Sequence, residues 1–233
     1  MGIFDKKFCG VCGDKIGLLG NRKLEDGNLC GNCAKKLSPF FTGRRKTTLA
    51  DIKRQLAYRE ANKKEVAQFS VSRQFGQYTK VLIDDSAGKF IVASSDRWKS
   101  ENPDVIDISQ ITNFMIDIRE TREEMKTQDS DGNSVSYSPP RYEYYYNFYV
   151  VISVNSPYFS EIEAKLNKNR TGYRGSPEYR EFERQAYDLQ EALKIRQTTQ
   201  GGAPAALKMP RSCPNCGAPV AGGKSCTYCG TVF

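Results

Sequence analysis

The sequence predicts an α+β protein, in which an antiparallel β domain with a C-terminal helix is flanked by two small cysteine-rich modules. The eight cysteines fall into four Cys-x2-Cys pairs, two near each end of the chain. Residues 142–155 alternate between two faces, one of them largely apolar, which is typical of an antiparallel strand with one buried side. Residues 176–196 repeat apolar side chains every three or four positions after an N-capping Ser176, which indicates an amphipathic helix.

Each end of the chain has the cysteine spacing of a four-thiolate zinc site. Two residues between paired cysteines let the backbone turn tightly, so both sulfurs face one ion, and four soft thiolates suit Zn²⁺. Disulfides or a redox pair are the alternative, but a thioredoxin-like pair would be single and would accompany a βαβ pattern. The predicted metal ligands are Cys9, Cys12, Cys30 and Cys33 in one site, and Cys213, Cys216, Cys226 and Cys229 in the other.

Both predicted zinc sites are structural. Residues 1–40 and 211–233 are each too short for a self-sufficient apolar core, and domains below ~40 residues usually need a metal or disulfides. Four protein ligands also leave no coordination position for water or substrate. We therefore expect two structural Zn²⁺ ions, whose binding free energy contributes directly to folding.

The two modules differ in the residues between their cysteine pairs. The glycines of residues 15–29 predict a hairpin, and AKKL after Cys33 predicts a short helix that ends before Pro39. A knuckle, a hairpin and a helix with the second ligand pair resemble a treble-clef finger, with a ribbon-like module as the alternative. The string CPNCGAPVAGGKSCTYCG resembles a zinc ribbon with rubredoxin-like knuckles, and a flexible linker is expected at residues 198–210.

Residues 41–68 are interpreted as a linker followed by a helix. We interpret the basic residues 44–46 as a solvated hinge, with a phosphate contact as the alternative. Thr48 with Asp51 three positions later is a variant of the capping box, which predicts that the helix begins there. Its apolar face would carry Leu49, Ile52 and Leu56.

Residues 69–197 are predicted to form one β-rich domain with the closing helix at 176–196. Two apolar runs, at residues 81–83 and 90–92, flank the turn sequence DDSAG and predict a hairpin. A loop over residues 127–141 is expected to join two long strands. The further strands are expected at residues 105–108, 114–118, 142–155 and 162–166.

Two stretches of this chain resemble known families. An antiparallel sheet closed by one C-terminal helix, with the runs KVLIDDSAGKFIVAS and DVIDISQITNFMIDI, resembles the bacterial pleckstrin-homology-like fold. The opening FCGVCGDKIGLLGNRKLEDGNLCGNC, followed by QLAYREANK, resembles a bacterial family catalogued as a domain of unknown function. The resemblances imply an architecture and no activity.

The positive charge of the chain is concentrated near its N-terminus. The formal net charge is +8, but a tetrathiolate zinc site carries a net charge of −2, so two such sites would lower it to about +4. Residues 1–50 hold ten Lys or Arg and four Asp or Glu, whereas residues 51–204 are close to neutral. A basic N-terminal module favours an acidic partner.

Several classes of protein are disfavoured. No apolar run approaches the ~18 residues of a membrane span, and the start lacks the apolar stretch of a secretory signal, so we expect a cytoplasmic protein. The chain has no histidine, and neither a phosphate loop nor a nucleophile–base pair is recognisable, so we expect no enzyme. Residues 129–133 begin like a calcium loop, but their glycine comes two positions too early, which favours a β-turn.

Three classes of function remain open. The first is a non-enzymatic zinc-binding adaptor whose partner is a protein. The second is a nucleic-acid-binding protein, and the third is a peripheral membrane protein, by analogy with lipid-binding folds alone. In the second class the phosphate contacts would come from Lys6, Lys7, Lys15, Arg22, Lys23, Lys35 and Lys36.

Three aromatic residues are further candidates for recognition. Tyr145 and Tyr149 lie on the face opposite the buried row, where they would stack on a base or a peptide, or be covered by the helix after Thr48 or by a zinc module. Trp98 is either an exposed recognition residue or an anchor for its loop.

Overall fold

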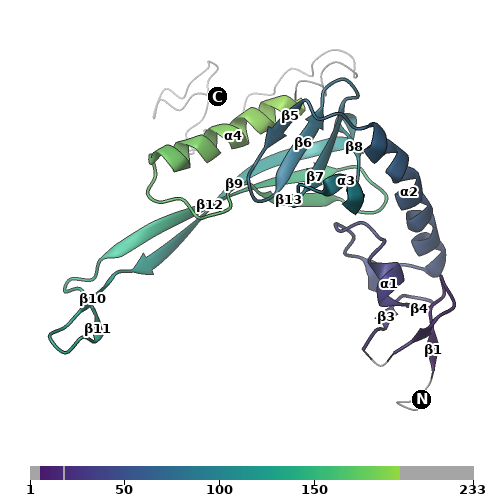
Figure 1. Ribbon diagram of the computed structural model, residues 1–233, viewed down its shortest axis with the longest axis horizontal. Coiled ribbons are helices and arrows are strands. Elements are labelled where there is room, and N and C mark those ends of the chain that lie inside the picture. The colour runs from purple at the N-terminus through teal and green to yellow at the C-terminus, as the bar shows by residue number, and fades with distance from the viewer. Residues whose placement is uncertain (1–5, 18, 195–233) are drawn as a thin grey trace, which may run out of the picture. The chain divides into compact units, whose positions relative to one another are not determined.

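The computed structural model describes residues 6–17 and 19–194, whose arrangement is shown in Figure 1. The chain divides into two compact units, residues 1–197 and 198–233. The predicted linker at 198–210 and the ribbon cysteines Cys213, Cys216, Cys226 and Cys229 lie outside the described residues. All structural statements below therefore concern the first unit.

The N-terminal part consists of two short hairpins and one helical turn. Strand β1 (Lys7–Phe8) pairs antiparallel with β2 (Lys15–Ile16), and β3 (Arg22–Lys23) pairs antiparallel with β4 (Asn28–Leu29). Helix α1 (Gly31–Ala34) follows directly. The hairpin and the short helix predicted from the sequence are both present.

Helix α2 (Leu49–Gln68) begins at the predicted cap. The hydroxyl of Thr48 accepts the backbone N–H of Asp51 at 3.2 Å, and the Asp51 carboxylate accepts the backbone N–H of Thr48 at 3.2 Å. These reciprocal bonds satisfy two of the N–H groups that a helix start leaves without partners. The capping box explains why the helix begins at this position.

The two halves of α2 pack on different apolar clusters. The first half buries Ile52 in the cluster that contains the N-terminal cysteines, with Leu49 and Leu56 against it. The second half buries Val66 in a cluster with Phe69, Leu82, Ile91, Ala93 and Trp98. The helix thus extends from the N-terminal hairpins to the β domain, as Figure 1 shows.

The β domain contains two antiparallel sheets. The first consists, in spatial order, of β5 (Arg73–Phe75), β6 (Lys80–Asp84), β7 (Lys89–Ala93) and β8 (Ile106–Asp107). The second has the order β13 (Glu161–Lys165), β12 (Tyr142–Val154) and β9 (Ile111–Glu124). The backbone carbonyl of Leu166 accepts the N–H of Gln77 at 2.6 Å, which joins the sheets, and the described residues form no closed barrel.

The main core lies between the sheets and helix α4 (Pro177–Lys194). The apolar row predicted on residues 142–155 is buried from Tyr146 onward, whereas Tyr142 and Tyr144 are exposed. Ser176 accepts the backbone N–H of Tyr179 at 3.1 Å, as expected of an N-cap. The predicted apolar stripe of the closing helix is buried throughout, at Tyr179, Phe182, Ala186, Leu189 and Leu193.

Residues 127–141 are not the simple loop that we expected. Strands β10 (Lys126–Gln128) and β11 (Ser134–Ser136) pair in a hairpin, at the end of the long β9–β12 pair in Figure 1. Asp129 closes its turn by accepting the N–H groups of Asp131 and Asn133 at 3.0 and 2.8 Å. The β-turn interpretation of residues 129–133 is confirmed.

The strand expected at residues 105–108 is shorter than predicted, and the position of Trp98 decides between its two predicted roles. The expected strand at 105–108 is shortened to β8, because Asp107 accepts the N–H of Ser109 and starts the 3₁₀ turn η2 (Ile108–Gln110). Trp98, at the start of helix α3 (Trp98–Glu101), is 9% exposed and its ring meets that of Phe69 edge-on. It is therefore a loop anchor.

None of the described helices combines the length and the apolar character that crossing a membrane requires.

Candidate metal centre

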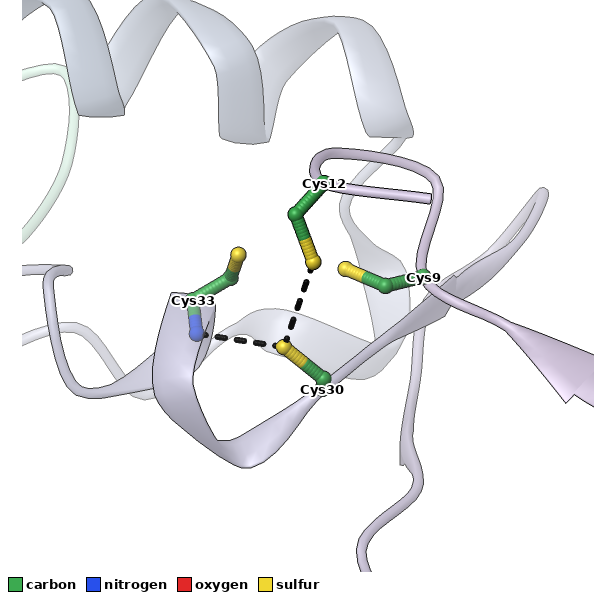
Figure 2. A group of neighbouring side chains, drawn as sticks. All are labelled: Cys9, Cys12, Cys30 and Cys33. Carbon is green, nitrogen blue, oxygen red and sulfur yellow. Dashed lines mark hydrogen bonds between the residues drawn. The ribbon is translucent and has the colours of Figure 1, made fainter. Parts of the chain in front are cut away.

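Four cysteine sulfurs converge in the N-terminal part of the chain (Figure 2). The Sγ atoms of Cys9, Cys12, Cys30 and Cys33 all lie within 4.8 Å of one another. Those of Cys12 and Cys30 are 3.7 Å apart, close to the edge of about 3.8 Å in a tetrahedron with zinc–sulfur bonds of about 2.3 Å. All four cysteines are free thiols rather than disulfides. The donor set and its spacing fit one tetrahedral Zn²⁺ ion.

The first ligand pair is held by the turn between β1 and β2. Gly13 donates its N–H to the carbonyl of Cys9 at 2.8 Å, and Cys9 donates to the carbonyl of Asp14 at 2.9 Å. Gly13 has a φ of +77°, a conformation that costs glycine little and other residues more. These bonds fold the knuckle so that both sulfurs point to the same side, as Figure 2 shows.

The knuckle packs closely on the start of α2. A Cβ atom added to Gly10 would lie 2.7 Å from Cδ2 of Leu49. The N–H of Gly10 donates to the carbonyl of Asn28 at 2.9 Å, and that of Leu49 donates to the Asp26 carboxylate at 2.7 Å. The first turn of α2 therefore packs with β1–β4 and α1 around the four cysteines, and we refer to these elements together as the metal-centre fold.

The second ligand pair lies at the start of α1. Cys30 is the N-cap of this helix, and its Sγ accepts the backbone N–H of Cys33 at 3.4 Å. Cys9, Cys30 and Cys33 are buried, whereas Cys12 is exposed. The apolar side chains around them are Ile16, Leu24, Leu29, Leu37 and Ile52.

The electrostatics of the cluster favour a cation. Burial raises the pKa of the Cys9 thiol, but backbone hydrogen bonds from Cys12, Cys30 and Val11 outweigh it and lower this pKa to about 6. The Asp14 backbone lowers the pKa of Cys12, yet the Asp14 carboxylate, burial and Cys9 together raise it to about 11. Burial, followed by the neighbouring thiols, raises the pKa of Cys33. Ionised sulfurs this close repel one another, and a divalent ion removes that repulsion.

A buried polar network connects the metal-centre fold to the β domain. Arg59 of α2 donates from Nη1 to Oδ1 of Asp104 at 2.7 Å, and the Ser38 hydroxyl donates to Oδ2 of Asp104 at 2.7 Å. Arg59 also donates from Nε to the carbonyl of Lys36 at 3.3 Å. The side chains of Arg59 and Asp104 are 8% and 0% exposed. One guanidinium thus joins the segment after α1, helix α2 and the loop before β8.

Asn62 extends this network by one helical turn. Its Nδ2 donates to Oδ1 of Asn102 at 2.8 Å and to the carbonyl of Pro103 at 2.7 Å, and its Oδ1 accepts the N–H of Val105 at 2.9 Å. Sequence analysis missed this junction, because polar residues on a helix normally indicate a solvated face. The only available signal was that Arg59 and Asn62, three positions apart, lie on the same helix face.

The two candidate recognition tyrosines, Tyr145 and Tyr149, have surroundings that the sequence did not predict. Among the described residues, an arginine lies over each ring: the guanidinium of Arg170 lies 3.7 Å from the Tyr145 ring, and that of Arg119 lies 3.8 Å from the Tyr149 ring. Arginine stacks well on an aromatic face. These two rings therefore already have stacking partners from the chain itself.

The predicted phosphate-contacting residues lie on the surface of the metal-centre fold. Their side chains are exposed, and no basic residue between positions 6 and 46 forms an ion pair within the described part of the chain. The exposed set is Lys6, Lys7, Lys15, Arg22, Lys23, Lys35 and Lys36. These basic side chains therefore have no carboxylate within ion-pairing distance among the described residues.

The comparison with protein families agrees with this local geometry. Residues 7–55 match a family described as "Domain of unknown function (DUF4428)". The matched segment contains all four clustered cysteines and extends to Leu49 and Ile52, which pack on the same apolar cluster. No curated protein and no solved structure matches the chain. Fold and site thus define a small four-cysteine domain attached to an α+β domain.

Proposed function

We propose that this protein is a non-enzymatic, zinc-binding interaction protein. The observation that carries the proposal is the cluster of four cysteine sulfurs within 4.8 Å of one another, three of them on buried residues. Four thiolates complete the coordination of Zn²⁺ and leave no position for a substrate, so the ion would stabilise a fold. The four ligands predicted from the sequence, Cys9, Cys12, Cys30 and Cys33, would therefore have an architectural role.

We further propose that the β domain has a pleckstrin-homology-like fold. Supporting this are one four-stranded and one three-stranded antiparallel sheet, joined near Leu166, and a C-terminal helix packed on both. The fold by itself does not determine a ligand. What supports an adaptor role is the fixed connection through Arg59 and Asp104, because it would present the zinc-held surface and the sheet surface to a partner together.

Nucleic acid is the second candidate partner. The specific observation in its favour is the exposed basic set on the metal-centre fold, which forms no ion pairs among the described residues. Phosphate contacts from such residues would make binding strongly dependent on salt. A protein partner would instead contact apolar and polar surface with a weaker dependence on salt.

Affinity capture with the full-length chain tests the proposal and separates the two partners. We expect wild-type protein to retain a protein partner after nuclease treatment, and the Cys30→Ser variant to lose it together with its N-terminal zinc. Lys35→Gln/Lys36→Gln is the matched variant that leaves the metal ligands intact. Loss of the partner on nuclease treatment would favour nucleic acid, and equal capture by Cys30→Ser would contradict a role for zinc.

A further inference from the structure

A cavity of about 430 Å³ lies beside the 3₁₀ turn η1 (Arg44–Lys46), in the segment between α1 and α2. Its lining includes the basic residues Arg44, Arg45 and Lys46 and the apolar residues Leu37 and Phe41. This volume falls within the range of about 300–1,000 Å³ that is usual for small-molecule sites. No acidic residue lines it.

The turn that carries the three basic residues is fixed in place. Lys46 donates its N–H to the carbonyl of Gly43 at 3.0 Å, and the Thr47 hydroxyl donates to the same carbonyl at 2.9 Å. The carbonyl of Thr47 accepts the N–H of Glu25 at 3.1 Å, which ties the turn to the β3–β4 hairpin. Residues 44–46 therefore form an ordered turn rather than a hinge, whereas the exposed side chains of Arg45 and Lys46 agree with the solvated surface that the sequence indicated.

The basic groups of this turn have no partner of opposite charge. None of the three forms an ion pair within the described part of the chain. In addition, Nε of Arg44 is buried and has no hydrogen-bond acceptor among the described residues. A buried N–H without an acceptor is unfavourable, and native structures seldom leave one unless a ligand or water completes it. An anion that drew the Arg44 guanidinium toward the cavity would remove this cost.

We propose that this cavity binds the phosphate group of a phosphomonoester. The planar guanidinium fork matches the geometry of phosphate oxygens, and the adjacent positive charges of Arg44, Arg45 and Lys46 suit the dianion of a terminal phosphate. Leu37 and Phe41 would contact the organic part of the ligand. A nucleic-acid backbone carries a single charge on each phosphate and follows an extended surface, so it fits a cavity of this size less well.

The phosphomonoester has two sources that share this chemistry: a free phosphorylated metabolite or a lipid headgroup. The site rests on the zinc-dependent fold proposed above, because η1 is attached to the β3–β4 hairpin. Zinc content measured on each variant separates the two proposals. A variant that keeps its zinc but lacks phosphate binding leaves the zinc proposal intact.

Isothermal titration of the zinc-loaded full-length chain with phenyl phosphate at low salt is the direct test. We expect Arg44→Gln/Arg45→Gln to bind at least about tenfold more weakly, since charge-assisted hydrogen bonds are lost. Lys53→Gln/Lys64→Gln removes the same charge from exposed side chains of α2 outside the cavity, and should stay within about twofold of wild type. No binding by wild type, equal weakening in both double variants, or equal affinity for dimethyl phosphate would overturn the proposal.

Two further measurements complete the test. Vesicles of phosphatidylcholine with phosphatidic acid should compete with phenyl phosphate if the source is a headgroup, whereas the free ligand alone binds if it is a metabolite. Arg44→Leu removes the buried Nε, so without ligand it should melt no lower than wild type and should lose the stabilisation by phenyl phosphate. A lower melting temperature in the absence of ligand would show that the Arg44 guanidinium is a structural group, which would contradict the site.

Discussion

The guanidinium of Arg59 and the carboxylate of Asp104 form a buried ion pair, with Nη1 and Oδ1 2.7 Å apart. Arg59 belongs to α2, and Asp104 lies in the loop before β8. Ser38, from the segment after α1, donates to the second oxygen of the same carboxylate. Because these groups are shielded from water, each one needs the others as partners. The metal-centre fold and the β domain are therefore connected by specific bonds as well as by apolar contacts.

Removing one member of this pair should be strongly destabilising. Asp104→Ala leaves the Arg59 charge buried, and we expect the free energy of unfolding to fall by about 3–5 kcal/mol. Replacing both residues, in Arg59→Met/Asp104→Leu, should cost less than Asp104→Ala alone. Urea denaturation measures the three values. Lys63→Ala, which breaks only an exposed pair with Glu60 on the same helix, is the control and should have little effect.

Zinc removal should loosen the metal-centre fold and the first half of α2 together. Ile52 belongs to the apolar cluster of the cysteines, whereas Val66 belongs to the cluster under the first sheet. After treatment with a chelator, hydrogen exchange should accelerate in β3, β4, α1 and the first turns of α2. Strands β6, β7 and β12 should keep their protection, since their core is separate. Equal loss of protection in β12 would show a single cooperative unit.

Asp84 should make stability depend on acid pH. Burial raises the pKa of its carboxyl, but hydrogen bonds from the Ser86 hydroxyl and the backbone N–H groups of Ser70 and Ala87 outweigh it and lower this pKa below its ordinary value of 3.8. A lowered folded-state pKa gives stability that is present above the ordinary value and is lost as the pH falls below it.

The comparison that tests this is urea denaturation of wild type and Asp84→Asn between about pH 5 and pH 2. Wild type should lose more stability over this interval than the variant. Any zinc that the chain binds is lost from both proteins in acid, so the difference between them isolates Asp84. Parallel curves would mean that the carboxylate bonds contribute no pH dependence.

Thr48→Ala should destabilise the start of α2. The variant removes one half of the capping box, and such losses typically cost about 1 kcal/mol. Thr48→Ser, which keeps the hydroxyl, should restore most of the loss. Because the first turn of α2 packs on Gly10 of the zinc knuckle, the alanine variant should also release zinc to a chelator faster than wild type. Unchanged zinc release would indicate that the cap and the knuckle are independent.

Local chemistry made much of the fold predictable. The capping box at Thr48, the β6–β7 hairpin and the buried row from Tyr146 depend on neighbouring residues or on a period of two, which a sequence displays directly. The cysteine spacing likewise indicated which four side chains of residues 6–46 the structure brings together. The zinc site of Cys213, Cys216, Cys226 and Cys229 and the flexibility of the linker at 198–210 remain predictions, since these residues lie outside the described part of the chain.

Contacts between distant polar residues were not predictable in the same way. Arg59 and Asp104 are 45 positions apart, and neither belongs to a periodic pattern. The arginines that cover Tyr145 and Tyr149 come from other strands or loops, so alternation on β12 alone did not reveal them. A loop was expected where β10 and β11 form a hairpin. Its turn depends on hydrogen bonds from the backbone N–H groups of Asp131 and Asn133 to the Asp129 carboxylate.

The central claim is that Cys9, Cys12, Cys30 and Cys33 bind one structural Zn²⁺ ion. The most direct measurement is the metal content of a full-length variant in which Cys213, Cys216, Cys226 and Cys229 are all serine. Elemental analysis should give about one zinc per chain, and the four remaining thiols should react with a thiol reagent only after a chelator is added. A chain with no zinc and with four freely reactive or oxidised cysteines would contradict the account.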